Sequence, residues 1–176
     1  LITLKEFGFK SERLLERLDG YFQKYKVVVP VEEECYIEVL SPVKMRFKAY
    51  SMWPNSIQTS PTPPEGLKGT LVYADDGDLE DFNGKHIEGS IVMLRYDCGR
   101  RWLNAFKLGA KAVIFMETPH ATRLDSLAKI LITPIYTPRV YVTADVGAEL
   151  LKLLKEHGKV EVRVVSRVFY REVEAY

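Results

Sequence analysis

The sequence predicts a mixed α/β (α+β) fold in which a β core is flanked by two or three helices. Strand-like runs rich in β-branched and aromatic residues occur near both ends of the chain. A strand–helix–strand succession occupies residues 90–116. A leucine-rich segment with helical spacing, ADVGAELLKLLKEHG, occupies residues 144–158. Together these patterns predict both strands and helices in one domain-sized chain.

The first 49 residues divide into a helical part and a strand part. Residues 3–19 predict one broken helix or two short ones. Residues 25–49 change to a strand pattern in the runs YKVVVPV, CYIEVL and VKMRFKAY. The Ser41-Pro42 break between the last two runs indicates a hairpin. Pro30 places the first run at a sheet edge, because proline cannot donate a hydrogen bond to a strand ladder.

The remaining elements follow in order. GTLVYA is predicted as a strand, and the acidic run after it as a loop with one helical turn. SIVMLRY and AKAVIFM are buried strands around a helix, GRRWLNAFKLG, so we expect them to pair in parallel. Residues 117–139 form a long loop with a short helix at RLDSLAKI. A strand, RVYVT, the leucine-rich helix and an alternating tail to Tyr176 complete the chain, and we expect more protein to follow that tail.

Composition excludes some classes of function. The formal net charge is +1, which argues against nucleic-acid or membrane-surface binding driven by bulk charge. No apolar run reaches the roughly 18–20 residues of a membrane span. The sequence therefore predicts neither a nucleic-acid partner nor a membrane segment. Cys35 and Cys98 both lie in apolar runs, which leaves open whether they form a disulfide or remain buried thiols.

No catalytic constellation is visible. The three histidines, His86, His120 and His157, are far apart, and neither an H-E-x-x-H nor a G-x-S-x-G motif occurs. Carboxylates crowd the stretch DDGDLED, but the spacing of a calcium loop is absent. We therefore predict no catalytic residue and no metal ligand. Such a chain more often binds, covers or positions something.

Three stretches in succession resemble a protease-associated (PA) domain. They are DFNGKHIEGSIVML, which enters a core strand, then GAKAVIF, and then VYVTADVGAELL. The pattern is most similar to the PA domains found within, or before, zinc aminopeptidases of the M28 type. It covers residues 50–155, and the order and spacing of its parts are more specific than any one part.

The resemblance implies a swivelling β/β/α module that is not itself an enzyme. Residues 1–49 would precede this module, residues 50–158 would form it, and residues 159–176 would lead toward a following domain. The module would shape substrate access or mediate protein or peptide interaction in an M28-like aminopeptidase. Its partners would be a peptide substrate or the peptidase domain of the same chain. No cofactor is expected in this chain, and zinc is expected in the absent peptidase domain.

Two loops are the candidate binding surface, because binding residues tend to lie on loops held by a rigid scaffold. The first, residues 51–65, carries Trp53 and Asn55. The second, residues 117–139, carries three further candidates, His120, Arg123 and Arg139.

Two other functions remain open from the sequence. The chain could be a stand-alone peptide- or protein-binding module of the sorting-receptor kind. It could also be a small hydrolase with a site built from His120, Asp125 and Cys98.

Overall fold

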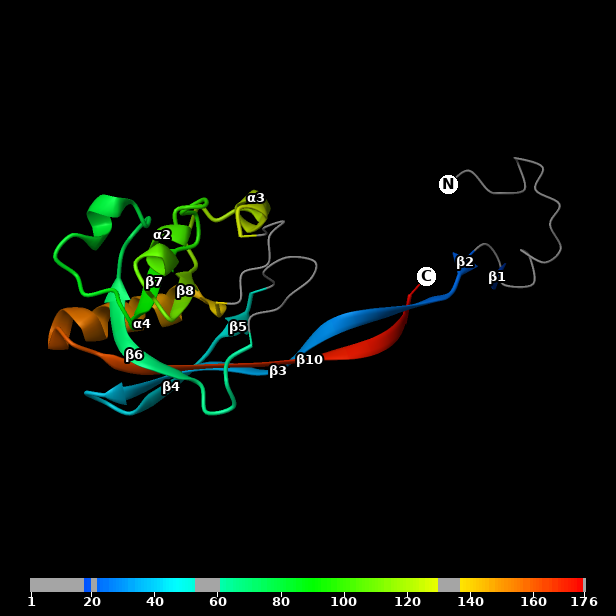
Figure 1. Cartoon of the computed structure of the whole chain (residues 1–176), viewed down its shortest axis with the longest axis horizontal. Helices are drawn as coiled ribbons and strands as arrows, with labels where there is room; N and C mark the ends of the chain where they lie inside the picture. The colour runs from blue at the N-terminus through cyan, green and yellow to red at the C-terminus, as the bar shows by residue number, and fades with distance from the viewer. Residues whose placement is uncertain (1–17, 20–21, 53–60, 130–136, 176) are drawn as a thin grey trace. The chain divides into compact units, whose positions relative to one another are not determined.

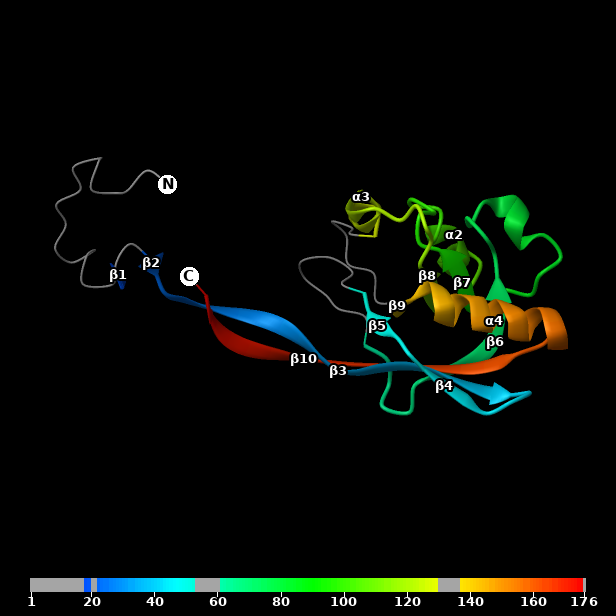
Figure 2. The same ribbon diagram turned by 180° about the vertical axis from the view of Figure 1, so that it is seen from behind.

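The structure is a computed structural model that describes residues 18–19, 22–52, 61–129 and 137–175 (Figures 1 and 2). The chain divides into two compact units. The smaller comprises Leu1–Val31 with Phe169–Tyr176, and the larger comprises Glu32–Val168. The domain boundaries expected from the sequence, after residues 49 and 158, stay a prediction.

The strands and helices alternate along most of the chain. In sequence order they are β1 (Leu18–Asp19), β2 (Phe22–Gln23), β3 (Tyr25–Ser41), β4 (Met45–Lys48), β5 (Tyr50–Ser51), β6 (Leu67–Tyr73), the 3-10 helix η2 (Leu79–Phe82), β7 (Ile91–Arg95), α2 (Leu103–Lys107), β8 (Ala112–Met116), α3 (Arg123–Leu127), β9 (Arg139–Val142), α4 (Ala144–His157) and β10 (Glu161–Ala175). The mixed α/β class predicted from the sequence is confirmed, and so are its flanking helices.

The larger unit is built on a sheet with the strand order β4-β3-β10-β6-β7-β8-β9-β5. Strands β6 to β9 are parallel, whereas the β3–β4, β6–β10 and β5–β9 pairs are antiparallel. β4 and β5 stand at opposite ends of this order, yet only Ala49 separates them in the sequence. The sheet therefore closes on itself at Ala49, whose amide donates to the Cys35 carbonyl at 3.1 Å.

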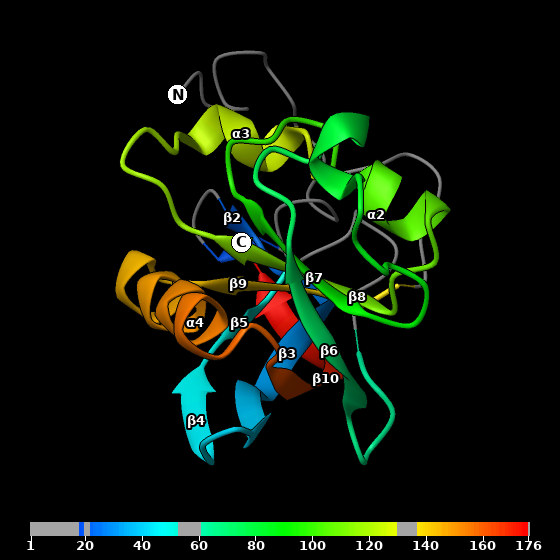
Figure 3. The same cartoon turned by 90° about the vertical axis from the view of Figure 1, so that its left-hand side faces the viewer.

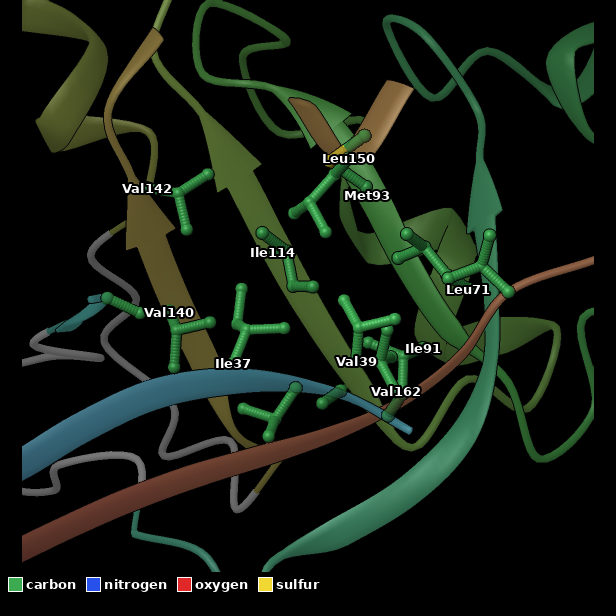
Figure 4. Packing of buried hydrophobic residues seen from close by; sticks show 14 of the residues in the cluster. Ile37, Val39, Leu71, Ile91, Met93, Ile114, Val140, Val142, Leu150 and Val162 are labelled. Carbon is green, nitrogen blue, oxygen red and sulfur yellow. The ribbon is translucent and has the colours of Figure 1, made fainter. Parts of the chain in front are cut away.

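The central strands β7 and β8 are buried on both faces. Their sequences, IVMLR and AVIFM, are continuous apolar runs, as expected for parallel strands covered on both sides. Alternate residues of each strand join two separate clusters. Figure 4 shows the first cluster, where side chains from the parallel strands meet those of β3, β10 and α4. The expected parallel pairing of these two strands is confirmed.

Helix α4 covers the first cluster. Leu150 and Leu153 are its buried leucines, and Gly158, with a φ of +72°, ends the helix as predicted. Gly147 lets the helix approach β8, since a β-carbon there would lie 2.1 Å from the Cγ of Met116. The opposite face of the sheet is covered by η2 and α2, through Phe82 and the residues around Trp102 (Figure 3).

The first fifty residues differ from expectation in two ways. β3 runs unbroken where two strands were expected, and only its part from Tyr36 to Val39 pairs with β4, so this pairing does not reach the run that contains Pro30, which was expected at an edge. Pro30 is tolerated because β4 pairs only with Tyr36–Val39. Leu18–Asp19 is a short strand, whereas the rest of the expected helix over residues 3–19 lies outside the described residues. The hairpin at Ser41-Pro42 is confirmed, and its peptide bond is cis.

The smaller unit contains the antiparallel β1–β2 pair and the outer parts of β3 and β10. Lys26 and Glu172 form an ion pair of 2.7 Å within it. In neither unit does a described helix have the length and apolar character needed to cross a membrane.

Glu32 on β3 bonds to residues of β4 and β5, on either side of Ala49, and these bonds should depend on pH. Its carboxylate accepts hydrogen bonds from the Ser51 amide at 2.6 Å and the Lys48 ammonium at 3.1 Å. Burial alone would raise the pKa of Glu32, but the bonds from Ser51 and Lys48 outweigh it and lower the pKa below its ordinary value of 4.5.

A carboxyl whose pKa is depressed by folding stabilises the protein above the unfolded pKa, and this stability is lost as the pH falls through the folded pKa. We therefore expect the free energy of unfolding to fall below pH 4.5, and Glu32→Gln to flatten that fall. Urea denaturation, followed by circular dichroism at several acidic pH values, measures the free energy of unfolding of both proteins. Glu33→Gln, at an exposed neighbour on the same strand, is the control. If both variants flatten the fall equally, the assignment of this pH dependence to Glu32 is wrong.

Candidate functional site

The carboxyl ends of β6, β7, β8 and β9 meet at one edge of the sheet, because these strands are parallel. The loops at the carboxyl ends of parallel strands are frequent places for binding residues on a rigid scaffold. Tyr96 and Asp97 follow β7, Glu117 and Thr118 follow β8, and Tyr141 lies within β9. A ligand at this edge would therefore meet polar and aromatic side chains from several strands.

One part of the edge is an ion-pair network. The Arg95 guanidinium donates to the Asp97 carboxylate at 2.9 and 3.2 Å and lies 3.4 Å from Asp76. Arg101 lies 3.6 Å from Asp76 and 3.5 Å from Asp78. Burial would raise the pKa of Asp97, but the Arg95 guanidinium outweighs it, and the pKa lies below its usual range. These carboxylates are thus already neutralised by arginine.

The other part of the edge is a surface hollow of about 350 Å³, here called the tyrosine hollow. It is lined by Tyr50, Met52, Tyr96, Glu117, Ala121, Thr122 and Tyr141. Tyr96 and Tyr141 meet edge to face with ring centroids 5.4 Å apart, and Tyr50 lies 6.2 Å from Tyr141. Met52 belongs to the first candidate loop and Glu117 to the second. The structure therefore brings the described ends of both loops to one place.

Glu117 is the acidic group of the tyrosine hollow. Its Oε2 accepts the amide of Ala144, the first residue of α4, at 3.1 Å. Burial, together with a hydrogen bond to Glu117, raises the pKa of the Tyr141 hydroxyl. No lysine, arginine or histidine is among the lining residues, although the ammonium groups of Lys48 and Lys129 lie 5.1 and 5.0 Å from the ring centroids of Tyr50 and Tyr96. A carboxylate beside aromatic faces favours an ammonium or guanidinium group.

Two buried cations hold the second candidate loop to the fold. Lys129, 1% exposed, donates to the carbonyls of Tyr96 at 2.7 Å and Gly99 at 3.1 Å. Arg139, 0% exposed, donates to the Lys129 carbonyl at 2.9 Å and lies 4.7 Å from the ring centroid of Trp102. Burial lowers the pKa of Lys129, and it lowers the pKa of Arg139 to about 10. Both cations therefore serve the attachment of the loop.

The structure separates the sequence-predicted site residues. Trp53 and Asn55 lie outside the described residues. His120 is exposed in the second loop, and Arg123 begins α3, with its side chain outside the described part. Arg139 differs from the expected loop residue: it begins β9, and its side chain is buried because it stacks on Trp102.

The residues of the suggested hydrolase site have other surroundings. Asp125 accepts hydrogen bonds from the Thr122 amide and hydroxyl, and so caps α3. Cys98 is buried, and burial raises the pKa of its thiol, which disfavours the reactive thiolate. Cys35 is also a buried free thiol, with a pKa raised to about 12 by burial. Both cysteines are free, which answers the question that the sequence left open.

Sequence reasoning missed the residues that line the tyrosine hollow. Tyr50, Tyr96 and Tyr141 are far apart in the chain, and their meeting depends on the β5–β9 pair. One signal was available: Tyr96 and Glu117 each directly follow a buried parallel strand. That position predicts the carboxyl edge of the sheet, but not which side chains would share a hollow there.

No protein-family model matches the sequence, and no curated protein sequence matches it. Solved structures do match the fold. An aminopeptidase from Aneurinibacillus sp. strain AM-1 has a TM-score of 0.53 and 20% identity over 87% of this chain and 35% of that one. A peptidase M28 precursor from Shewanella amazonensis SB2B has a TM-score of 0.59 and 16% identity over 93% of this chain and 41% of that one.

A zinc aminopeptidase from Bacillus subtilis has a TM-score of 0.56 and 20% identity over 85% of this chain and 35% of that one. At these identities the similarity shows the fold alone. The chain has a mixed α/β fold similar to that of part of the M28 aminopeptidases. It spans 35–41% of the length of these three structures.

The two buried cations should differ in their contribution to stability. Lys129→Met removes the ammonium donor from two half-buried carbonyls, at about 1–3 kcal/mol each, and that of Gly99 keeps only the weak bond from the Cys98 thiol at 3.9 Å. Arg139→Met leaves one carbonyl unpaired, but it also removes Nε and Nη2, two buried nitrogens without a hydrogen-bond partner among the described residues. Replacing a buried charge by an apolar side chain of similar volume is often neutral.

We expect Lys129→Met to lower the free energy of unfolding by roughly 2–4 kcal/mol and Arg139→Met by about 1 kcal/mol or less. Guanidinium denaturation of both variants at neutral pH compares them directly. Equal destabilisation would show that Arg139 contributes more than its single hydrogen bond.

Proposed function

We propose that this chain is a non-catalytic, protease-associated type of module of an M28-like zinc aminopeptidase, in which it shapes the access of peptides. The observation that carries the proposal is the pattern of coverage. Nearly the whole chain aligns with M28 aminopeptidase structures, yet it spans only 35–41% of them. The chain thus corresponds to one part of such proteins. The succession of motifs over residues 50–155 supports the same module.

The tyrosine hollow is the part of the module proposed to contact peptides. Tyr50 is 45% exposed, and the Lys48 ammonium lies 5.1 Å from its ring centroid, so the ring already takes part in a cation–π contact of the kind proposed for the ligand. A peptide presents an ammonium at its amino terminus and on lysine side chains. Such a group would interact with the Glu117 carboxylate and the tyrosine rings. The same hollow would serve a stand-alone peptide-binding module, which is the alternative function.

Zinc is assigned to the peptidase domain and not to this chain. The described residues contain no group of three or more His, Cys, Asp or Glu side chains that could hold a metal ion. The described residues therefore do not fit a zinc site of the kind expected in a zinc aminopeptidase.

The proposal predicts that the chain by itself does not hydrolyse peptides. The purified protein is incubated with leucine p-nitroanilide and with a leucine tripeptide, in the presence of zinc chloride and separately of a chelator. We expect no release of p-nitroaniline or leucine above the protein-free rate in either condition. Turnover that depends on zinc and co-elutes with the protein would overturn the non-catalytic assignment.

The proposal also predicts that the tyrosine hollow binds a peptide ammonium. The probe is a leucine tripeptide amide with a free amino terminus, and its N-acetylated form is the matched ligand control. We expect Tyr50→Ala to weaken binding of the free amine roughly twofold to fivefold, as for an exposed cation–π contact. Tyr25→Ala, at another exposed tyrosine, should leave binding unchanged.

Isothermal titration calorimetry measures both affinities. If the acetylated tripeptide binds as tightly as the free amine, the hollow does not select an ammonium, and this role of Glu117 and Tyr50 is wrong.

A further inference from the structure

We propose a second ligand site of opposite charge, beside β6, that takes the carboxyl-terminal residue of a peptide. It is a surface hollow of about 520 Å³, here called the basic hollow. Its lining residues are Thr70, Leu71, Val72, Tyr73, Lys85, His86, Leu154, Gly158 and Lys159. The tyrosine hollow shares none of them.

The basic hollow exists because the pairing of β10 with β6 does not extend to the carboxyl end of β6. β10 pairs with β6 only as far as Thr70, and the last bond runs from the Leu71 amide to the Val160 carbonyl at 2.8 Å. Beyond it, Gly158 and Lys159 connect β10 to the carboxyl end of α4.

The backbone of β6 contributes polar groups to this hollow. The Ala74 amide donates to the Met93 carbonyl on the β7 side, at 3.0 Å. Because successive peptide groups of a strand point in opposite directions, the Tyr73 amide and carbonyl face away from β7. The Tyr73 carbonyl accepts the Lys85 ammonium at 2.9 Å, which confirms this direction. The Tyr73 amide therefore offers a donor on the same side.

Basic side chains line the basic hollow, and acidic ones do not. Lys85, His86 and Lys159 line it, and no aspartate or glutamate does. Lys85 is held in place by two carbonyls, those of Tyr73 and of Asp81 at 2.6 Å, which leaves one of its three N–H groups. Lys159, whose side chain is 74% exposed, pairs with Glu161 at 3.1 Å just outside the lining. A carboxylate would complete the hydrogen bonding of Lys85.

The carboxyl end of α4 would repel an anion if its carbonyls were unpaired, because the helix dipole is negative there. Two of them are satisfied within the chain. The Gly158 amide donates to the Leu154 carbonyl and the Lys159 amide to the His157 carbonyl, both at 2.8 Å. The lysines thus supply the charge that an anion would meet.

An apolar surface adjoins the basic groups. Leu71 is buried in the core and Leu154 is half-buried, and both line the hollow. The volume lies within the roughly 300–1,000 Å³ typical of small-molecule sites. A carboxylate joined to an apolar side chain matches this arrangement, and the carboxyl-terminal residue of a peptide has both. The choice of a peptide rests on the proposed function, whereas the choice of a carboxylate rests on the hollow.

The test uses N-acetylated Ala-Leu with a free carboxylate and, as the matched ligand, the same dipeptide as an amide. Acetylation removes the ammonium, so ammonium-dependent binding at the tyrosine hollow does not contribute to the measurement. Titrations are followed by ¹⁵N nuclear magnetic resonance of the whole chain. We expect the acid to shift the amide signals of Tyr73, Lys85 and Gly158, and to bind about twofold to fivefold more tightly than the amide.

Variants then test the charges. Lys159→Glu should weaken binding of the acid about fivefold or more, since it places a like charge beside the ligand. Lys155→Glu makes the same change at an exposed residue of α4 that does not line the hollow, and should have a smaller effect. Lys85→Arg keeps the charge, whereas Lys85→Met should abolish the preference for the acid. The unbound spectra show whether each variant is folded.

Equal binding of acid and amide, or shifts confined to the residues around Tyr50 and Tyr141, would overturn the proposal. Absence of binding up to millimolar ligand would overturn it as well. None of these results affects the proposed function, which is tested by the free amine at the tyrosine hollow. Conversely, loss of ammonium binding at that hollow would leave the carboxylate preference of the basic hollow intact.

Discussion

The closure of the sheet at Ala49 is the constraint on which the larger unit depends. One residue separates the strand that pairs with β3 from the strand that pairs with β9, so these two strands cannot move apart. Hydrogen bonds on both sides secure the closure. Ser51 bonds to Glu32 on β3 and to Ser166 on β10, and the Met52 amide donates to the Arg139 carbonyl on β9 at 3.1 Å.

This closure also determines what the tyrosine hollow contains. Tyr50 lies directly opposite Tyr141 in the β5–β9 register, and Met52 follows two residues later. Buried groups support the other side of the hollow: Lys129 bonds to the Tyr96 carbonyl, and Arg139 bonds to Lys129. The exposed Tyr50 and the half-buried Tyr96 and Tyr141 therefore rest on a largely buried support, which reduces the conformational entropy lost when a ligand binds.

The two hollows arise where the regular ladder of the sheet ends, and they have opposite charge. One lies beyond the carboxyl ends of parallel strands and presents Glu117 among tyrosines. The other lies beside β6, where β10 has left it, and presents Lys85 and Lys159. A peptide has both an ammonium and a carboxylate, so opposite charges on one module suit peptides better than they suit a single small ion. Arg95 and Arg101 pair with three further carboxylates of the edge, those of Asp76, Asp78 and Asp97.

Local patterns in the sequence determined the fold class and most of its elements. The continuous apolar runs of β7 and β8, the leucine spacing of α4 and its final Gly158 are each legible within about fifteen residues, because hydrophobic period and turn chemistry are local. The sequence could not show that β3 is one strand, since Pro30 is acceptable only where β4 ends. Nor could it show that Arg139 is buried or that three distant tyrosines meet. Those outcomes depend on which strands pair, and only the tertiary structure decided that, because pairing is set by contacts between residues far apart in the chain.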